Sequence, residues 1–143
     1  MNDNDARLTR VYTAVTGGTV EEEIPDQPDA GEPADSDFDL FIEAAAGNNI
    51  GNSGTPYTLT ITAVNVTKQA VVGAYSSAAN EAFNAVNGWT ANGDDFVKTQ
   101  GVTFPAPAPA PSAPNDLYRF YVSLVTPSLQ IASFAESNLF MLV

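Results

Sequence analysis

The side chains that could carry out chemistry in this sequence are carboxylates. The 143 residues include 17 Asp and Glu, five Lys and Arg, and neither His nor Cys. This composition excludes disulfides, zinc sites built from Cys and His, and every nucleophile that depends on a His general base. Two acids can still hydrolyse a glycoside. No spacing pairs the candidate acids, so we expect no enzymatic activity and no cofactor. The candidates are Glu43, Asp94, Asp95, Asp116 and Glu136.

A binding site is conceivable around the only tryptophan. Asp94 and Asp95 could supply oxygens to a Ca²⁺ ion, and Trp89 in the loop-like sequence NGWTANG could stack on a sugar. This arrangement would make a carbohydrate-binding module, which is the alternative function. The simpler interpretation is that Trp89 fills one end of the core, since large aromatic residues are mostly buried. We therefore assign no metal site.

The negative charge is concentrated near the N-terminus. The net charge is −12, and 12 of the 17 acids fall within residues 1–43. Residues 21–36 are rich in acids and prolines and favour an extended, polyproline-like loop. Such a path would align every third residue, about 9 Å apart. We expect a row of acids that meets basic side chains of a partner, with a solvated loop as the simpler alternative. The row consists of Asp26, Asp29, Glu32 and Asp35.

Most of the remaining chain alternates apolar and polar residues with the period of two that is typical of β-strands. Only residues 77–87 have the apolar spacing of a short amphipathic helix. We predict a single all-β domain over residues 1–143, an antiparallel β-sandwich of immunoglobulin-like or jelly-roll type. The predicted strands are 8–16, 37–46, 56–66, 69–76, 95–104, 117–125, 129–134 and 138–143.

The C-terminal part suggests contacts with other subunits. Residues 105–114 contain five prolines and form a stiff crossing that could span about 30 Å. Residues 115–143 follow as C-terminal strands, either within the same sandwich or exchanged between subunits. The chain ends in a strand that is apolar on both faces and must be covered. Tyr121 faces away from its apolar neighbours and could also meet a partner. The predicted contacts at the end of the chain are Leu139, Phe140, Met141 and Leu142.

These features together predict a non-enzymatic structural subunit of a larger assembly, such as a virion coat, decoration or tail protein, or a filament component. We expect other protein subunits as partners, most simply copies of this chain in a homo-oligomer, with a glycan as the alternative ligand. The acidity argues against nucleic acid and anionic membranes. The first ten residues lack an apolar signal segment, so we expect synthesis in the cytoplasm and incorporation into a particle such as a virion.

Overall fold

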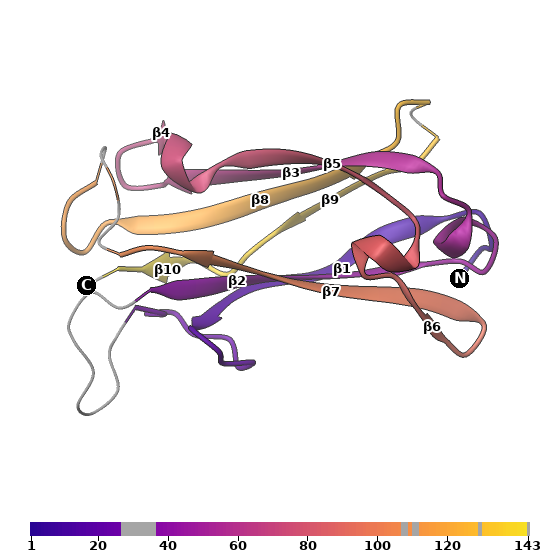
Figure 1. Ribbon diagram of the computed structural model, residues 1–143. Helices are drawn as coiled ribbons and strands as arrows, with labels where there is room; N and C mark the ends of the chain where they lie inside the picture. The colour runs from indigo at the N-terminus through magenta and orange to yellow at the C-terminus, as the bar shows by residue number, and fades with distance from the viewer. Residues whose placement is uncertain (27–36, 107–108, 110–111, 129, 143) are drawn as a thin grey trace.

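The computed structural model describes residues 1–26, 37–106, 109, 112–128 and 130–142 and is all-β (Figure 1). Its strands form two antiparallel sheets, which we call sheet A and sheet B. Sheet A contains, in spatial order, β1 (Ala6–Val15), β2 (Phe38–Ala46), β7 (Asp95–Phe104) and β6 (Thr90–Asn92). Sheet B contains β10 (Phe140–Met141), β8 (Leu117–Val125), β3 (Pro56–Asn65) and β4 (Ala70–Val71), while β5 (Ser77–Ala82) also pairs with β3 and β9 (Ala132–Glu136) with β8. Three short 3-10 helices lie among the described residues: η1 (Ile50–Asn52), η2 (Gly73–Tyr75) and η3 (Ala85–Asn87).

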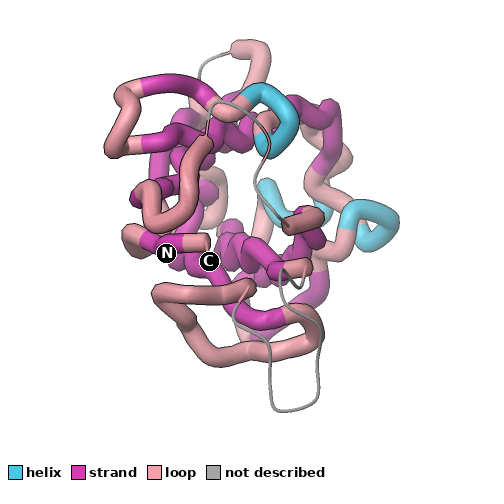
Figure 2. The backbone as a smooth tube through the Cα atoms, turned by 90° about the vertical axis from the view of Figure 1, so that its left-hand side faces the viewer, coloured by secondary structure: helices cyan, strands magenta, loops and turns pink. Residues whose placement is uncertain are grey.

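The two sheets form separate layers that enclose one apolar interior (Figures 1 and 2). The central strands of sheet B show why they form, because every second residue of β3 and β8 is buried. In β3 the buried set includes Leu59 and Ile61, and in β8 it includes Phe120 and Val122. The period of two predicted for residues 56–66 and 117–125 is therefore confirmed.

Aromatic side chains join the two layers towards the end of the sandwich where β2 begins and β7 ends. Phe38 of β2 and Phe104 of β7 belong to sheet A, and their ring centroids lie 5.7 Å apart. Phe120 of β8 stacks on Phe104 at 5.1 Å and lies 6.4 Å from Phe38. Phe140 of β10 stacks on Phe120 at 5.3 Å. Each of these rings is buried. Aromatic pairs at such distances add about 0.5–1.5 kcal/mol beyond the area that they bury.

One side of the sandwich is closed by contacts between β1 and the C-terminal segments. The Leu8 amide donates to Ser133 Oγ at 2.9 Å, and the Thr13 amide donates to Asn138 Oδ1 at 3.0 Å. The Met141 amide donates to the Glu23 carbonyl oxygen at 2.8 Å. These bonds occupy backbone groups that an open sheet edge would leave unpaired.

The segment expected to be a short helix forms a strand instead. Residues 77–82 are β5, which pairs with β3 from Pro56 to Ile61, and the following residues form η3. The helical spacing came mostly from alanines, whose small side chains fit a strand as well as a helix. Pairing with β3 therefore overrides the local pattern. Phe83 is buried beside Tyr57, whereas Val86 is 92% exposed.

The C-terminal strands are shorter than predicted and shifted. The expected strand 129–134 corresponds to β9 at Ala132–Glu136, and the expected strand 138–143 to the two residues of β10. Both pair with β8 of the same chain. β7 lies in sheet A and β8 in sheet B, so the proline-rich segment between them joins the two sheets.

We expect Phe120→Ala to lower the free energy of unfolding by about 3–5 kcal/mol, because it leaves a cavity among the stacked rings. Phe134→Ala is the matched control, since Phe134 is 74% exposed and its removal should change stability by less than about 0.5 kcal/mol. Urea denaturation followed by tryptophan fluorescence measures both. Similar losses in the two variants would show that the ring cluster does not hold the sheets together.

Candidate functional site

The outer face of sheet B carries two exposed aromatic side chains. Tyr121 of β8 is 42% exposed and Phe134 of β9 is 74% exposed. Tyr121 points outward because its neighbours Phe120 and Val122 point into the core. The register pairs Phe134 with Ser123, two residues along β8 from Tyr121. The two rings are therefore diagonal neighbours on the same face.

A hollow of about 430 Å³ lies between these two rings. Its floor consists of small side chains of neighbouring strands, with Thr62 opposite Tyr121 and Thr60 opposite Ser123. The walls are mostly apolar while the floor offers hydroxyl groups, so the hollow can accept an apolar side chain and hydrogen-bond to polar groups around it. Its lining residues are Thr60, Thr62, Tyr121, Val122, Ser123, Phe134, Ala135 and Glu136.

The charge on this face is balanced. Arg119 Nη1 lies 3.8 Å from Glu136 Oε1, and Arg119 Nε donates to the Ser137 carbonyl oxygen at 3.1 Å. The ion pair is long and the Glu136 side chain is 58% exposed, so it contributes little to stability. Both groups remain accessible beside the hollow.

The outer face of sheet A offers a direct contrast. There Tyr12 of β1 stacks on Phe41 of β2 with ring centroids 5.4 Å apart, and the Arg10 guanidinium carbon lies 3.9 Å from the centroid of the Tyr12 ring. The Tyr12 hydroxyl donates to the Thr19 carbonyl oxygen at 3.3 Å, and Tyr12 is only 3% exposed. On sheet A the chain itself therefore covers Tyr12 and leaves Phe41 half-buried, whereas both rings of the pair on sheet B are exposed.

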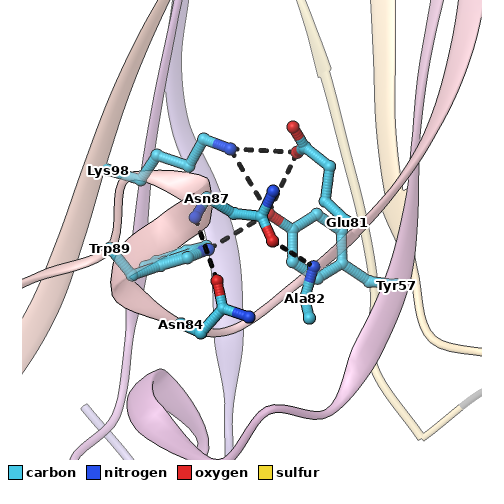
Figure 3. A network of polar contacts seen from close by, with 7 residues as sticks. All are labelled: Tyr57, Glu81, Ala82, Asn84, Asn87, Trp89 and Lys98. Atoms are coloured by element: carbon cyan, nitrogen blue, oxygen red, sulfur yellow. Dashed lines mark hydrogen bonds and ion pairs between the residues drawn. The ribbon is translucent and has the colours of Figure 1, made fainter.

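A second cluster of functional groups lies inside the sandwich (Figure 3). Tyr57 comes from β3, Glu81 from β5 and Lys98 from β7, so the cluster joins sheet B to sheet A. Lys98 Nζ donates to Glu81 Oε1 at 2.9 Å and to the Tyr57 hydroxyl at 3.4 Å. The Tyr57 hydroxyl donates to Glu81 Oε1 at 3.0 Å and accepts from Trp89 Nε1 at 3.1 Å. Burial raises the pKa of Tyr57, and the nearby Glu81 carboxylate adds to the effect.

The polar groups of this cluster bond to one another and are not available to a ligand. Lys98 is 8% exposed and its ammonium is paired with Glu81, and the cavity that the two residues help to line measures only about 10 Å³, too small for a substrate. Replacement of one partner would leave the other buried without its counter-ion, which is costly. The arrangement accordingly serves to link the sheets.

Two asparagines hold the turn that delivers Trp89 to the interior. Asn84 Oδ1 accepts from the Asn87 amide at 2.9 Å, and Asn87 Oδ1 accepts from the Ala82 amide at 3.0 Å (Figure 3). The Trp89 amide donates to the Asn84 carbonyl oxygen at 3.2 Å. Trp89 is 2% exposed, and the centroid of its ring lies 5.0 Å from that of the Phe83 ring. The interpretation that Trp89 fills the core is confirmed, and its ring offers no exposed face to a sugar.

A third cluster anchors the end of the proline-rich crossing. Asp116 Oδ2 accepts from Lys68 Nζ at 2.8 Å, from Asn65 Nδ2 at 2.7 Å and from the Ala113 amide at 2.8 Å. The Lys68 hydrogen bond, followed by that of Asn65, lowers the pKa of Asp116. The carboxylate ties the start of β8 to the turn after β3.

The predicted row of acids is described only at its first member. Asp26 is fully buried, and its charge contributes to the raised pKa values of Tyr75 and Tyr118, after the larger effect of burial. It therefore lies near these two rings. Asp29, Glu32 and Asp35 lie outside the described residues.

The predicted contacts at the end of the chain differ in their exposure. Phe140 and Leu142 are buried in the core, Met141 is half-buried, and Leu139 is 39% exposed.

The structure does not bring Trp89 and the two aspartates of the predicted ligand site together. In the β6–β7 hairpin, Thr90 pairs with Val97 and Asn92 with Asp95, which places Asp94 and Asp95 at the opposite end from Trp89.

Sequence reasoning missed Phe134 and the cluster of Lys98 and Glu81. Phe134 lies in the predicted strand 129–134, where alternation favours burying the aromatic ring and exposing the small neighbours Ser133 and Ala135. The structure shows the opposite, with Ala135 packed against the core and Phe134 exposed. Lys98 and Glu81 lie 17 residues apart in the sequence, on strands of different sheets. The contact between Lys98 and Glu81 joins the two sheets, and the spacing of residues in the sequence does not predict such a contact.

No model of a known protein family matches the chain, and searches of curated proteins and of solved structures found no match. Among the described residues, no helix is long and apolar enough to span a membrane. The same part of the chain contains no group of three or more acids that could hold a metal ion.

We expect Glu81→Gln to lower the free energy of unfolding by about 3 kcal/mol, because it leaves the Lys98 ammonium buried without a counter-ion. The same change at Glu136, whose side chain is exposed, should cost less than about 1 kcal/mol. Urea denaturation at neutral pH compares the two variants. Equal losses would contradict the role assigned to the buried cluster.

The lowered pKa of Asp116 predicts a specific dependence of stability on pH. The native carboxyl group binds its proton at lower pH than the unfolded one, whose pKa is about 3.9. Its stabilising effect is therefore complete well above that value and is lost as the pH falls through the native pKa. We expect Asp116→Asn to destabilise the protein at neutral pH and to lose less stability than the wild type on acidification.

Urea denaturation over a series of pH values measures this difference. Lys68→Met removes the largest cause of the lowered pKa and should change the profile in the same direction, to a smaller extent. Parallel profiles for wild type and Asp116→Asn would refute the assignment.

Proposed function

We propose that this chain is a non-enzymatic structural subunit that assembles with other protein subunits through the outer face of sheet B. The observation that carries this proposal is the exposure of Phe134 and Tyr121 on either side of the hollow. Exposed aromatic residues beside a pocket are typical of the residues that dominate protein–protein binding energy. In the aromatic pair on the other sheet, by contrast, Tyr12 is buried under Arg10 and Phe41 is half-buried.

The partner that fits this face best is a second copy of the chain. The net charge of −12 makes two copies repel each other over most of their surface. Lys68 and Lys98 do little to offset this, because each is paired with an acid of its own chain. Around the hollow, by contrast, Arg119 and Glu136 balance each other. Two copies therefore meet with the least repulsion at this face.

The shape of the face supports a symmetric contact. Phe134 projects from the surface directly beside a hollow lined by small side chains. Under a twofold axis, each copy would insert its Phe134 ring into the hollow of the other, since a dimer interface of this kind uses the same patch on both subunits. Arg119 of one copy could then pair with Glu136 of the other.

The size of the face predicts a weak contact. The four strands β9, β8, β3 and β5, spaced about 4.8 Å apart and about 20 Å long, offer a projected area of roughly 400 Å² per copy. Stable interfaces bury about 800 Å² per partner. Weak contacts suffice when many copies are held in an array. A twofold contact closes into a dimer, so a particle such as a virion or a filament, the assembly class expected from the sequence, would need further contacts beside this one.

We also propose that the sandwich is immunoglobulin-like. The order β1-β2-β7-β6 corresponds to strands A-B-E-D of that fold, and β3, β8 and β9/β10 correspond to C, F and G. The position of Tyr118 at the start of β8 also fits that of the tyrosine corner, although its hydrogen bond goes to the side chain of Ser112, six residues upstream, and not to the backbone. Phe120 stands two residues later, where antibody domains carry a disulfide Cys.

The solution mass measured by light scattering over a range of concentrations tests the assembly. We expect the wild type to pass from monomer to dimer, and Phe134→Ser to weaken the dimer roughly 30-fold, the effect of removing an interface residue worth about 2 kcal/mol. Val86→Ser is the matched control, because Val86 is 92% exposed on η3 and not on sheet B.

A wild type that remains monomeric at every concentration, or a Phe134→Ser variant that dimerises as well as the wild type, would contradict the proposal. Tyrosine fluorescence of the same samples, titrated with a panel of glycans, tests the alternative. A saturable change that Tyr121→Ser abolishes would favour a carbohydrate-binding module at this face.

A further inference from the structure

The sequence contains two Asn-Gly steps, Asn87-Gly88 and Asn92-Gly93, and the structure treats them differently. Asn-Gly is the step most prone to spontaneous deamidation, because glycine has no side chain to hinder attack by its own backbone nitrogen on the Asn side chain. The reaction needs a free nucleophile, the Gly nitrogen, and a free electrophile, the Asn Cγ atom. Hydrogen bonds to either group restrain it.

Asn92-Gly93 lies open at the tip of the β6–β7 hairpin. Asn92 and Gly93 are both exposed, and Asn92 pairs with Asp95 across the turn. Gly93 has a φ of +65°, and a Cβ atom placed on it would meet nothing within 4 Å. In a two-residue turn of this kind, the amide of the first turn residue takes no part in the strand ladder. β6 is a three-residue edge strand with every residue exposed, so local opening is easy.

Asn87-Gly88 is held on both sides of the reacting bond. The Gly88 amide, which would be the nucleophile, donates to the Ala85 carbonyl oxygen at 3.1 Å. Asn87 Oδ1 accepts from the Ala82 amide at 3.0 Å, which fixes the side chain that would be attacked (Figure 3). The Asn87 amide is also bound, by Asn84 Oδ1 at 2.9 Å. Reaction at this step requires the first two of these bonds to break, because they hold the Gly88 nitrogen and the Asn87 side chain, while the third holds the turn in place.

We propose that Asn92 is a site of spontaneous deamidation and that Asn87 is protected by its hydrogen bonds. The Gly93 nitrogen loses its proton and attacks Asn92 Cγ, the bond from Cγ to the side-chain nitrogen breaks, and ammonia leaves. The product is a cyclic imide. Water then opens the imide at either carbonyl carbon and leaves an aspartate or an isoaspartate at position 92. Overall one water is consumed and one ammonia is released, with no oxidation or reduction.

The change would alter the hairpin chemically. It would add one negative charge next to Asp94 and Asp95, in a turn that carries no positive residue between Trp89 and Val97. The isoaspartate form would also insert a methylene group into the main chain of the turn, which disturbs the pairing of Asn92 with Asp95. This site is remote along the chain from Tyr121 and Phe134 and does not depend on the proposed assembly.

Peptide mapping by mass spectrometry after incubation of the full chain in mildly alkaline buffer tests the proposal. We expect conversion at position 92 to be at least about tenfold faster than at position 87, since breaking two hydrogen bonds costs about 1 kcal/mol each. Incubation in urea serves as the reference, because both steps should react at similar rates in the unfolded chain. Ammonia release and isoaspartate content are measured on the same samples.

Two variants make the test specific. Asn92→Ser should abolish most of the ammonia released by the folded protein. Asn84→Ala removes the bond to the Asn87 amide and should speed conversion at position 87 while leaving position 92 unchanged. Equal rates at the two positions in the folded protein, or a folded protein that is stable at position 92 while the urea sample reacts there, would overturn the proposal.

Discussion

The contact between the aromatic rings of Phe38, Phe104 and Phe120 is the interaction on which the rest of the structure depends. The two sheets are built from separate sets of paired strands, and without cysteine the chain cannot join them by a disulfide. Stacking across the interior takes that role. It also fixes which face of each strand is buried. Because side chains alternate along a strand, burying Phe120 places Tyr121 on the outside, and a slip of one residue would reverse both. The exposed face of sheet B is thus a consequence of the core.

Polar clusters reinforce this arrangement at the two ends of the sandwich and shape its electrostatic field. Lys98 with Glu81 joins the sheets, and Lys68 with Asp116 ties the start of β8 to the turn after β3. These pairs involve two of the five basic residues in the chain. Because these two lysines pair with acids of their own chain, most other acids on the surface lack a basic partner. Two copies of the chain therefore repel each other wherever the surface is not neutral.

The fold class and the orientation of the central strands could be predicted from the sequence because both follow from a strict period of two in β3 and β8. Tyr121 was recognised for the same reason, and Trp89 because a large aromatic residue is costly to expose. Prediction failed where local pattern and tertiary pairing compete, as in the alanine-rich β5. It also failed for contacts between distant residues, such as Lys98 with Glu81. Asp26 belongs to this second group, since its burial near Tyr75 and Tyr118 brings together residues that are far apart in the sequence.

The contrast between the two outer faces supports the proposal that sheet B is the interaction surface. Each sheet carries an outward pair of aromatic residues. On sheet A the chain covers one ring of its pair, placing Arg10 over Tyr12 and bonding the Tyr12 hydroxyl to Thr19. On sheet B, Arg119 likewise lies two residues from Tyr121. Its guanidinium, however, bonds to the Ser137 carbonyl oxygen and pairs with Glu136. Two exposed rings beside a hollow lower the solubility of a monomer, and a partner that covers them, as we propose, would remove this penalty.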